Sequence, residues 1–265
     1  MKLELFSHLK GRSIRATDGE IGKIKDLYFD DSFWTARYLV VDTGNWLNKR
    51  SVLISPVHIP AQQNWSGPSI AVDLTMDKVK NSPSVDSDRP VSRQEEEHYW
   101  NYYNFPYYWS YPGIWGFGIY PADLYDRSLT EKDFKFNLFR HNEDPHLRSA
   151  NEVIGYSLDT LDGRMGSVDD LSFHGKTWSI RYLDVDTVRW WPSKHVLLSV
   201  DWIAKIDWVE KIFTVDLKKE TIKNSPEFEP KRHLTRQYEE RLHAYYNRVP
   251  YWYDLDQFTN RRRTA

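Results

Sequence analysis

The sequence repeats itself, and this repeat limits the chain to folds that can be built twice. The stretch ATDGEIGKIKDLYFDDSFWTARYLVVDT, beginning at Ala16, is matched by DTLDGRMGSVDDLSFHGKTWSIRYLDVDT, beginning at Asp159. Asp162 answers Asp18 at an offset of 144 residues (162 − 18), and later matches shift to an offset of 143. Two long copies with so little drift indicate a duplicated domain rather than a solenoid of short units.

The match extends beyond this stretch and suggests the domain organisation. SVLIS at 51–55 answers HVLLS at 195–199, and KNSP occurs at both 80–83 and 223–226. A chain of 265 residues suits about two domains. We expect four segments, which are a first copy over 1–83, a helical and aromatic connecting segment over 84–150, a second copy over 151–226, and a C-terminal helical and aromatic tail over 227–265.

Each copy is predicted to be β-structure. The dipeptides Asp18-Gly19 and Asp162-Gly163 are typical of tight turns between short apolar strands. The strand over 21–29 changes phase, because Ile24 lies on one face and Leu27 on the other. Such a change favours a bulge or a barrel corner.

The following strand predicts which face meets the core. Leu39 and Val41 alternate on one face, as do the residues that answer them in the second copy. Val40 on the opposite face is answered by Asp184, so we expect that face to meet water or a partner. Short helical turns are predicted over 75–80 and 218–223. Longer helices are predicted to begin after Ser92, which forms a capping box with Glu95, and after Thr235.

The combined pattern DG-x-x-G-x-x-x-D-L-x-F, R-Y-L-x-V-D-T and V-L-[IL]-S, with the trailing K-N-S-P, R-x-x-x-E-E and Y-Y-N, resembles the PRC-barrel family. The resemblance covers most of the chain, twice. It implies an all-β fold of two tandem small PRC-type β-barrels, each followed by a short helical, aromatic-rich tail. The family is similar to the cytoplasmic domain of the photosynthetic reaction-centre H subunit. It is also similar to the C-terminal domain of a bacterial 16S rRNA maturation factor that binds a ribosomal protein.

Charge and composition narrow the class of protein. A net charge of −2 gives no strong nucleic-acid signal, and we expect Arg261, Arg262 and Arg263 to be a solvated tail. The absence of cysteine excludes thiol nucleophiles, disulfides and thiolate metal ligands. No apolar run approaches the roughly 18 residues of a transmembrane segment, and residues 1–10 do not resemble a signal peptide. We therefore expect a cytoplasmic protein.

The histidines are candidates for metal ligation or catalysis. None of the nine lies in H-x-x-x-H or H-E-x-x-H. His141 and His146 flank acidic residues in RHNEDPH, where a polar linker is favoured over a loop metal site. His195 is answered by Ser51, so both copies cannot share that histidine, although one copy could still use it. We predict no catalytic residues, no cofactor and no metal. A perturbed carboxylate–histidine pair in a cleft would contradict that prediction.

Four aspartates recur in the repeat and are predicted to be structural turn or bulge residues, namely Asp26, Asp42, Asp170 and Asp186. Asp26 and Asp170 lie at the phase change and could pair with Arg37 and Arg181. Asp42 and Asp186 end a strand before threonine. Capping of a turn is favoured there, with paired carboxylates between facing barrels as the alternative.

Aromatic residues make up 15% of the chain and concentrate over 98–125. Prolines and glycines in this stretch rule out a long helix. We favour packing between the barrels for most of it, because small barrels need extra apolar cover. Part of it is predicted to be a docking surface for a second copy or an unknown protein, with Trp109, Tyr111, Trp115 and Phe117 as the candidates.

These features favour a non-enzymatic interaction or scaffold protein whose two repeats are related by an approximate twofold axis. One alternative is an RNA-processing or ribosome-associated factor. Others are a photosynthesis-associated or cofactor-binding protein like the H subunit, and an enzyme of unknown type.

Overall fold

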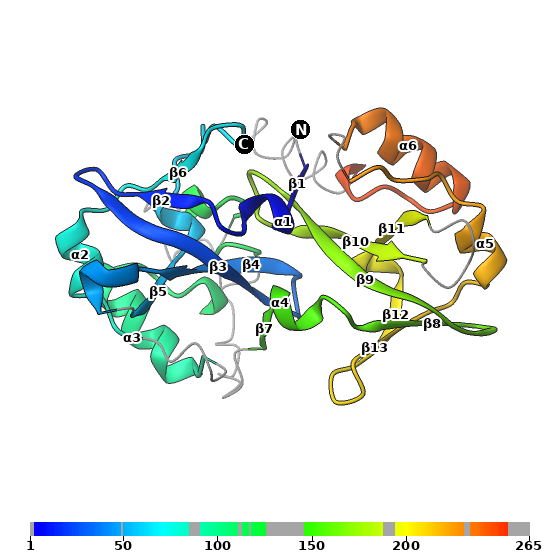
Figure 1. Cartoon of the computed structure of the whole chain (residues 1–265), viewed down its shortest axis with the longest axis horizontal. Coiled ribbons are helices and arrows are strands. Elements are labelled where there is room, and N and C mark those ends of the chain that lie inside the picture. Colours follow the sequence, from blue (N-terminus) through cyan, green and yellow to red (C-terminus); the bar gives the residue numbers. More distant parts are fainter. Residues whose placement is uncertain are drawn as a thin grey trace, which may run out of the picture.

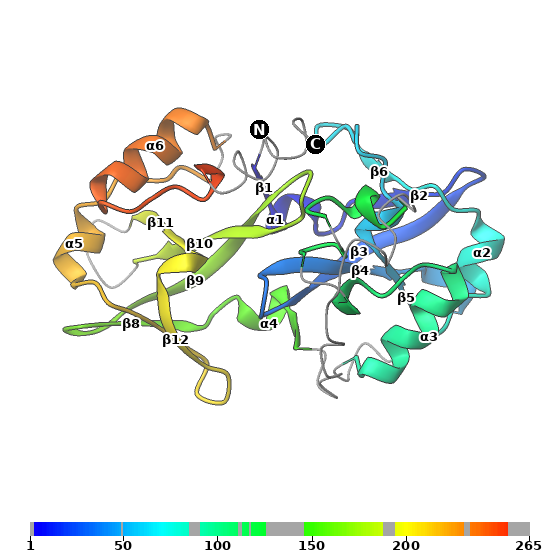
Figure 2. The same cartoon turned by 180° about the vertical axis from the view of Figure 1, so that it is seen from behind.

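The structure is a computed structural model that describes residues 3–48, 50–84, 91–110, 113–116, 118–125, 146–187, 194–230 and 234–253. These residues are mostly strands in two curled sheets with few helices (Figure 1), and Figure 2 shows the same arrangement from behind. The first sheet has the order β5-β4-β3-β2-β6, and the second has the order β11-β10-β9-β8-β13-β12. Both orders are open paths among the described residues, so the prediction of two closed barrels is not confirmed.

The strands of the two sheets follow one another in the same order. The first sheet contains β2 (Ser13–Arg15), β3 (Glu20–Asp30), β4 (Thr35–Asp42), β5 (Ser51–Ile54) and β6 (Ser69–Ala71). The second contains β8 (Ser157–Thr160), β9 (Gly163–His174), β10 (Ile180–Asp186), β11 (His195–Ser199), β12 (Ile203–Asp207) and β13 (Ile212–Val215). The parallel pair β2–β6 has its counterpart in β8–β13.

The predicted local features are present. Asp18-Gly19 and Asp162-Gly163 lie at the turns that lead into the long strands β3 and β9. A register shift between Ile24 and Asp26 marks a bulge in β3, at the predicted phase change. Because two residues of a bulged strand oppose one on its neighbour, this break explains why the apolar pattern switches face.

The helices also begin where their caps predict. Two of them, α3 (Arg93–Tyr103) and α6 (Arg236–Tyr245), follow Ser92 and Thr235, and the Ser92–Glu95 capping box is complete. The short turns are α2 (Met76–Lys80) and α5 (Lys219–Lys223). Further short helices are α1 (Phe6–Leu9) and α4 (Ala150–Val153). Single 3-10 turns occur at Gly44–Leu47, Pro56–His58, Tyr108–Ser110, Pro121–Tyr125 and Val200–Trp202.

One expectation about the sheet faces is wrong. Val40 is 1% exposed and Asp184 is fully buried, so their shared face meets neither water nor a separate partner. Helices of the same chain cover it instead. The hydroxyl of Tyr38 on β4 donates to Glu96 on α3 at 2.8 Å, and Tyr182 on β10 donates to Glu239 on α6 at 3.0 Å.

The two sheets exchange their shortest strands. The N-terminal strand β1 (Leu3–Leu5) pairs with β9 in the second sheet, whereas β7 (Leu147–Ser149) pairs with β3 in the first. Each long strand therefore has two partners along one edge, a strand of its own half and a strand from the other half. This reciprocal strand exchange, visible near the centre of Figure 1, ties both halves together.

Asp26 and Asp170 fasten the exchanged segments. Asp170 accepts a hydrogen bond from the backbone of Ser7 at 3.1 Å, and Asp26 accepts one from the backbone of Asn151 at 3.1 Å. Ser7 and Asn151 are themselves 144 residues apart. Asp26 also accepts from the Ser149 hydroxyl at 2.5 Å. Each bulge aspartate thus holds the short helix that follows the other half's exchanged strand.

Arg37 and Arg181 do not pair with Asp26 and Asp170, contrary to the expectation from the sequence. Arg37 forms an ion pair with Asp30 at 2.5 Å, and Arg181 lies over the ring of Tyr251, 4.2 Å from its centroid. The carboxylates of Asp26 and Asp170 instead accept largely from backbone donors, one in the same strand and one in the exchanged segment.

The loops between β3 and β4 and between β9 and β10 meet at the centre of the exchange. Thr35 and Ser179 form an isolated antiparallel bridge. Two reciprocal backbone hydrogen bonds flank it, since Ala36 donates to the carbonyl of Trp178 and Ile180 donates to that of Trp34. Both tryptophans have positive φ angles of 48° and 62°, which bulky residues rarely adopt. Their rings stack on Phe29 and Phe173 at 5.3 and 5.2 Å. Contacts at one end of this interface therefore recur at the other.

We expect Asp26→Ala to loosen β7 and α4 specifically. It leaves buried backbone donors of Leu27 and Asn151 without an acceptor, which should lower the free energy of unfolding by about 1–3 kcal/mol. Hydrogen exchange should accelerate over 147–153, while Asp170→Ala should accelerate it over 3–9. The exposed Asp73→Ala is the matched control, with a change of roughly 0.5 kcal/mol or less. Equal costs for Asp26→Ala and Asp73→Ala would show that the carboxylate does not hold the exchanged segment.

Candidate functional site

The predicted turn aspartates lie at strand ends. Asp42 accepts a hydrogen bond from the backbone of Gly44 at 2.8 Å, which is the geometry of a capped turn. Asp186 is half-buried at the end of β10, opposite His195 on β11. The backbone carbonyl of Asp186 lies against Gly166, whose φ of 66° and lack of a side chain permit this approach.

The aromatic connecting segment is partly buried. Trp115 is fully buried, and its indole donates to the carbonyl of Thr177 in the second half at 2.8 Å. Trp109 is half-buried and stacks on Tyr107 at 4.7 Å. A buried Trp115 cannot belong to an exposed docking surface, and its position supports a packing role between the halves. Tyr111 and Phe117 lie outside the described residues.

The RHNEDPH stretch can be followed only at its end. His146 lies 3.2 Å from Asp31, which also pairs with Arg148 at 2.7 Å. His141, Glu143 and Asp144 lie outside the described residues, so the loop metal site stays an untested hypothesis.

A buried glutamate network occurs in each half. Glu96 accepts from Tyr38 at 2.8 Å and from Tyr108 at 2.9 Å, and its other oxygen lies 2.7 Å from Arg93. Arg37 lies 3.9 Å above the Tyr108 ring. In the second half the corresponding residues are Glu239, Tyr182, Tyr251, Arg236 and Arg181. One member differs, since Trp100 donates to Tyr38 at 2.6 Å whereas His243 lies 2.9 Å from Tyr182.

Burial raises the pKa of Glu96 to about 7, because the ionised carboxylate loses its hydration, although Arg93 and the tyrosine hydroxyls oppose this shift. A perturbed pKa is one mark of a functional group. The Glu96 side chain is fully enclosed, however, and every hydrogen-bonding partner comes from its own half. We interpret the network as a polar core that locks α3 onto the sheet.

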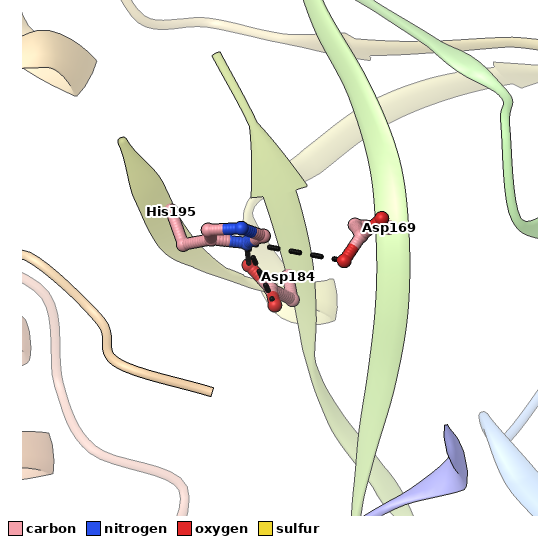
Figure 3. A group of neighbouring side chains, drawn as sticks. All are labelled: Asp169, Asp184 and His195. Carbon is pink, nitrogen blue, oxygen red and sulfur yellow. Dashed lines mark hydrogen bonds and ion pairs between the residues drawn. The ribbon is translucent and has the colours of Figure 1, made fainter. Parts of the chain in front are cut away.

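A second titratable cluster lies nearer to the surface, and Figure 3 shows it on three adjacent strands. His195 projects from β11 towards Asp184 on β10 and Asp169 on β9. Its Nδ1 lies 3.0 and 3.1 Å from the two carboxylate oxygens of Asp184 and 4.0 Å from Asp169. The possible ligand atoms of these three residues all lie within 4.8 Å of one another.

A bulge brings Asp169 into this cluster. Val185 pairs with Val168, but the next residue, Asp184, pairs with Asp170, so Asp169 is the additional residue in β9. In a bulge two residues oppose one, and the local twist redirects their side chains. The bulge thus places Asp169 beside Asp184, while Asp170 fastens the exchanged segment.

The cluster combines a buried acid with an accessible base. Burial raises the pKa of Asp184 to about 7, against the opposing effect of His195. Burial by itself would lower the pKa of His195, but the negative charge of Asp184 and its hydrogen bond outweigh it, so the pKa of His195 is raised. Among the described residues, Nε2 of His195 has no hydrogen-bond partner. The pair therefore orients an imidazole, but no described hydroxyl is positioned for activation.

Sequence reasoning missed this cluster because its members are neither close in sequence nor repeated. The sequence excludes only a histidine shared by both copies, because Ser51 corresponds to His195, and it predicts that the face of Asp184 meets water or a partner. Asymmetry between the copies was the available signal. Three neighbouring positions differ together, and at these positions the second half has two aspartates and a histidine where the first has Lys25, Val40 and Ser51.

A pocket of about 460 Å³ lies between the halves, away from this cluster. Its lining includes Pro60, Tyr120, Lys176 and Trp178. The volume falls in the range of small-molecule sites. The nearby Asp123 carboxylate is already engaged by the backbone of Ile119 and Tyr120, at 2.8 and 3.0 Å.

The comparisons with known proteins support the PRC-barrel resemblance for the first copy of the repeat. Residues 1–69 match the PRC-barrel domain. This segment contains β1 to β5 and ends at Ser69, the first residue of β6, so the match covers most of the first sheet together with the strand that it exchanges. No curated protein matches the chain. None of the helices in the described residues has the length and apolar character required to span a membrane.

The raised pKa of Glu96 predicts a pH-dependent stability. Its folded value of about 7 exceeds the ordinary 4.5, so the stability linked to the protonated form is complete below pH 4.5. That stability is lost as the pH rises towards 7 and beyond, by about 3 kcal/mol. Glu96→Gln should make the free energy of unfolding fall less between pH 5 and pH 8, as measured by urea denaturation.

Glu97→Gln, at the next position of α3, provides the control and should keep the wild-type pH profile. An unchanged slope in Glu96→Gln would mean that Glu96 stays ionised throughout and that its arginine neighbours dominate its pKa.

Proposed function

We propose that this chain is a non-enzymatic interaction protein made of two copies of a PRC-barrel module, over residues 1–83 and 151–226. The segment 84–150 connects them, and a tail over 227–265 follows the second copy, with α6 in its described part packing on that copy. The family match to 1–69, the corresponding strand orders and the returned contacts at an offset of 144 support duplication around an approximate twofold axis. The resemblance to modules of multi-subunit assemblies supports a docking role.

An exposed apolar surface at the end of α6 carries this proposal. Tyr245, Val249 and Tyr253 are 40%, 77% and 58% exposed and lie within one short segment. Scattered apolar side chains are normal on a protein surface, whereas several exposed ones within nine residues favour an interaction site. We call these three residues the α6 patch.

The first half does not present the same surface. At an offset of 143, Val249 and Tyr253 are answered by Pro106 and Ser110, whereas Tyr245 is answered by Tyr102. The two large apolar groups are thus additions of the second half. Tyrosine anchors protein interfaces well, because it buries a large area at little entropic cost. An apolar surface on a chain of net charge −2 favours a protein over a nucleic acid as the partner.

We expect Val249→Ser combined with Tyr253→Ser to abolish capture of the partner while leaving the chain folded. Both side chains are exposed, so their loss should change the free energy of unfolding by roughly 0.5 kcal/mol or less. The measurement is affinity purification from the native cell, with quantitative mass spectrometry of wild type against variant. Val209→Ser removes a side chain that is 86% exposed at the β12–β13 turn, and it should behave as wild type.

Each outcome of this purification is informative. Ribosomal proteins in the wild-type sample would favour the ribosome-associated alternative, and recovery of the chain itself would favour a homodimer. If the double variant captures the same proteins as wild type and the Val209→Ser control, docking takes place away from the α6 patch. A wild-type sample with no specific protein would contradict the interaction function.

A further inference from the structure

We propose that Asp169, Asp184 and His195 bind one divalent transition-metal ion of the zinc class. The geometry is suited to this, since an imidazole nitrogen and two carboxylates from three adjacent strands point toward one another (Figure 3). Zinc binds nitrogen and oxygen ligands at about 2.0–2.2 Å, so ligand atoms around one ion stand roughly 3–4 Å apart. The separations of 3.0, 3.1 and 4.0 Å around His195 Nδ1 need little adjustment.

The burial of Asp184 is an independent indication of a cation. Its side chain is fully buried, and among the described residues its carboxylate has no hydrogen-bond partner outside the cluster. A single imidazole N–H serves both oxygens, although an ionised carboxylate can accept about four hydrogen bonds. Buried charges in proteins are paired or coordinate metals, because an uncompensated one is costly. His195 gives each oxygen of Asp184 one partner, and a bound cation would occupy acceptor sites that this pair leaves open.

The first half provides an internal comparison. The positions that answer Asp169, Asp184 and His195 hold Lys25, Val40 and Ser51. Val40 is 1% exposed, so an apolar side chain fills this place between strand and helix without difficulty. The fold itself therefore does not require a buried acid there. All three ligand-type residues are found together in one half, and the corresponding positions of the other half hold none.

The donor set indicates the class of ion. Imidazole with carboxylate ligands suits zinc, manganese and related ions, whereas magnesium and calcium prefer oxygen ligands alone. Three protein ligands leave coordination positions open. The Asp169 side chain is 55% exposed, so water or a group of a partner can reach the ion from that side.

Chelator-treated full-length protein should bind one equivalent of Zn²⁺ in isothermal titration calorimetry. Asp184→Val and His195→Ser introduce the residues of the first half, and each should weaken binding by at least about 10-fold, a loss that even outer-sphere changes cause. His8→Ala, at an exposed histidine, is the control and should bind as wild type. Thermal unfolding gives a second readout, because Zn²⁺ should raise the Tm of wild type but not that of Asp184→Val.

Several results would overturn the proposal. These are a wild-type protein without a Zn²⁺ signal, full binding by Asp184→Val, and a loss in His8→Ala equal to that in His195→Ser. Displacement of Zn²⁺ by millimolar Mg²⁺ would overturn the assignment to transition metals. If Asp184→Val does not fold, Asp169→Lys and His195→Ser decide the question, since both change accessible side chains.

Discussion

The structure depends on the reciprocal strand exchange. Removal of β1 would expose part of one edge of β9, and removal of β7 would do the same to β3. An exposed edge carries unpaired backbone groups that favour aggregation. Each half therefore completes the other, and neither sheet is whole by itself. Domain swapping usually joins separate chains, whereas here both exchanged strands belong to one chain.

Asp26 and Asp170 make this arrangement specific. Burial raises the pKa of both carboxyls, because the ionised form loses its hydration, while hydrogen bonds from the exchanged segments act in the opposite direction. A buried polar group stabilises only the arrangement that supplies its donors. Leu27 and Leu171 donate from the aspartates' own strands, whereas Asn151 and Ser7 donate from the exchanged segments. The second pair of donors favours the exchanged pairing over alternatives in which β1 and β7 stay with their own sheets.

Features that depend on residues close in sequence could be predicted, whereas pairings between distant segments could not. Turns at Asp18-Gly19, the bulge at Asp26 and the cap at Ser92 depend on neighbouring residues, and the sequence pattern located each of them. The exchange joins Tyr28 to Ser149, and no local pattern indicates which long strand a short one will join. The sequence predicts that the face of Val40 meets water or a partner, because Asp184 occupies the corresponding position. Alternation within a strand shows only that two faces differ, and a helix from elsewhere in the chain covered the second one.

The two halves share a backbone arrangement but differ in some side chains. Comparing corresponding positions shows which polar side chains the fold itself requires. His58 takes the place of Trp202, and the two rings pack on Tyr103 and Tyr246 at 4.4 and 4.7 Å. Burial lowers the pKa of His58 to about 3, so it remains neutral and fills the space of an aromatic ring. A difference of this kind preserves packing and adds no charge.

Asp184 differs in kind from the other buried acids. Glu96 and Glu239 recur at matching positions, and each receives two tyrosine hydroxyls with an arginine nearby. These partners offset part of the cost of burial, and the recurrence fits a structural role. Asp184 occurs once, replaces a valine, and has one nitrogen donor for two oxygens. The frame does not require this acid, since valine fills the place in the other half, and a cation would occupy acceptor sites that the one nitrogen donor leaves open. The strand exchange supplies the rigid sheet that such a ligand site requires.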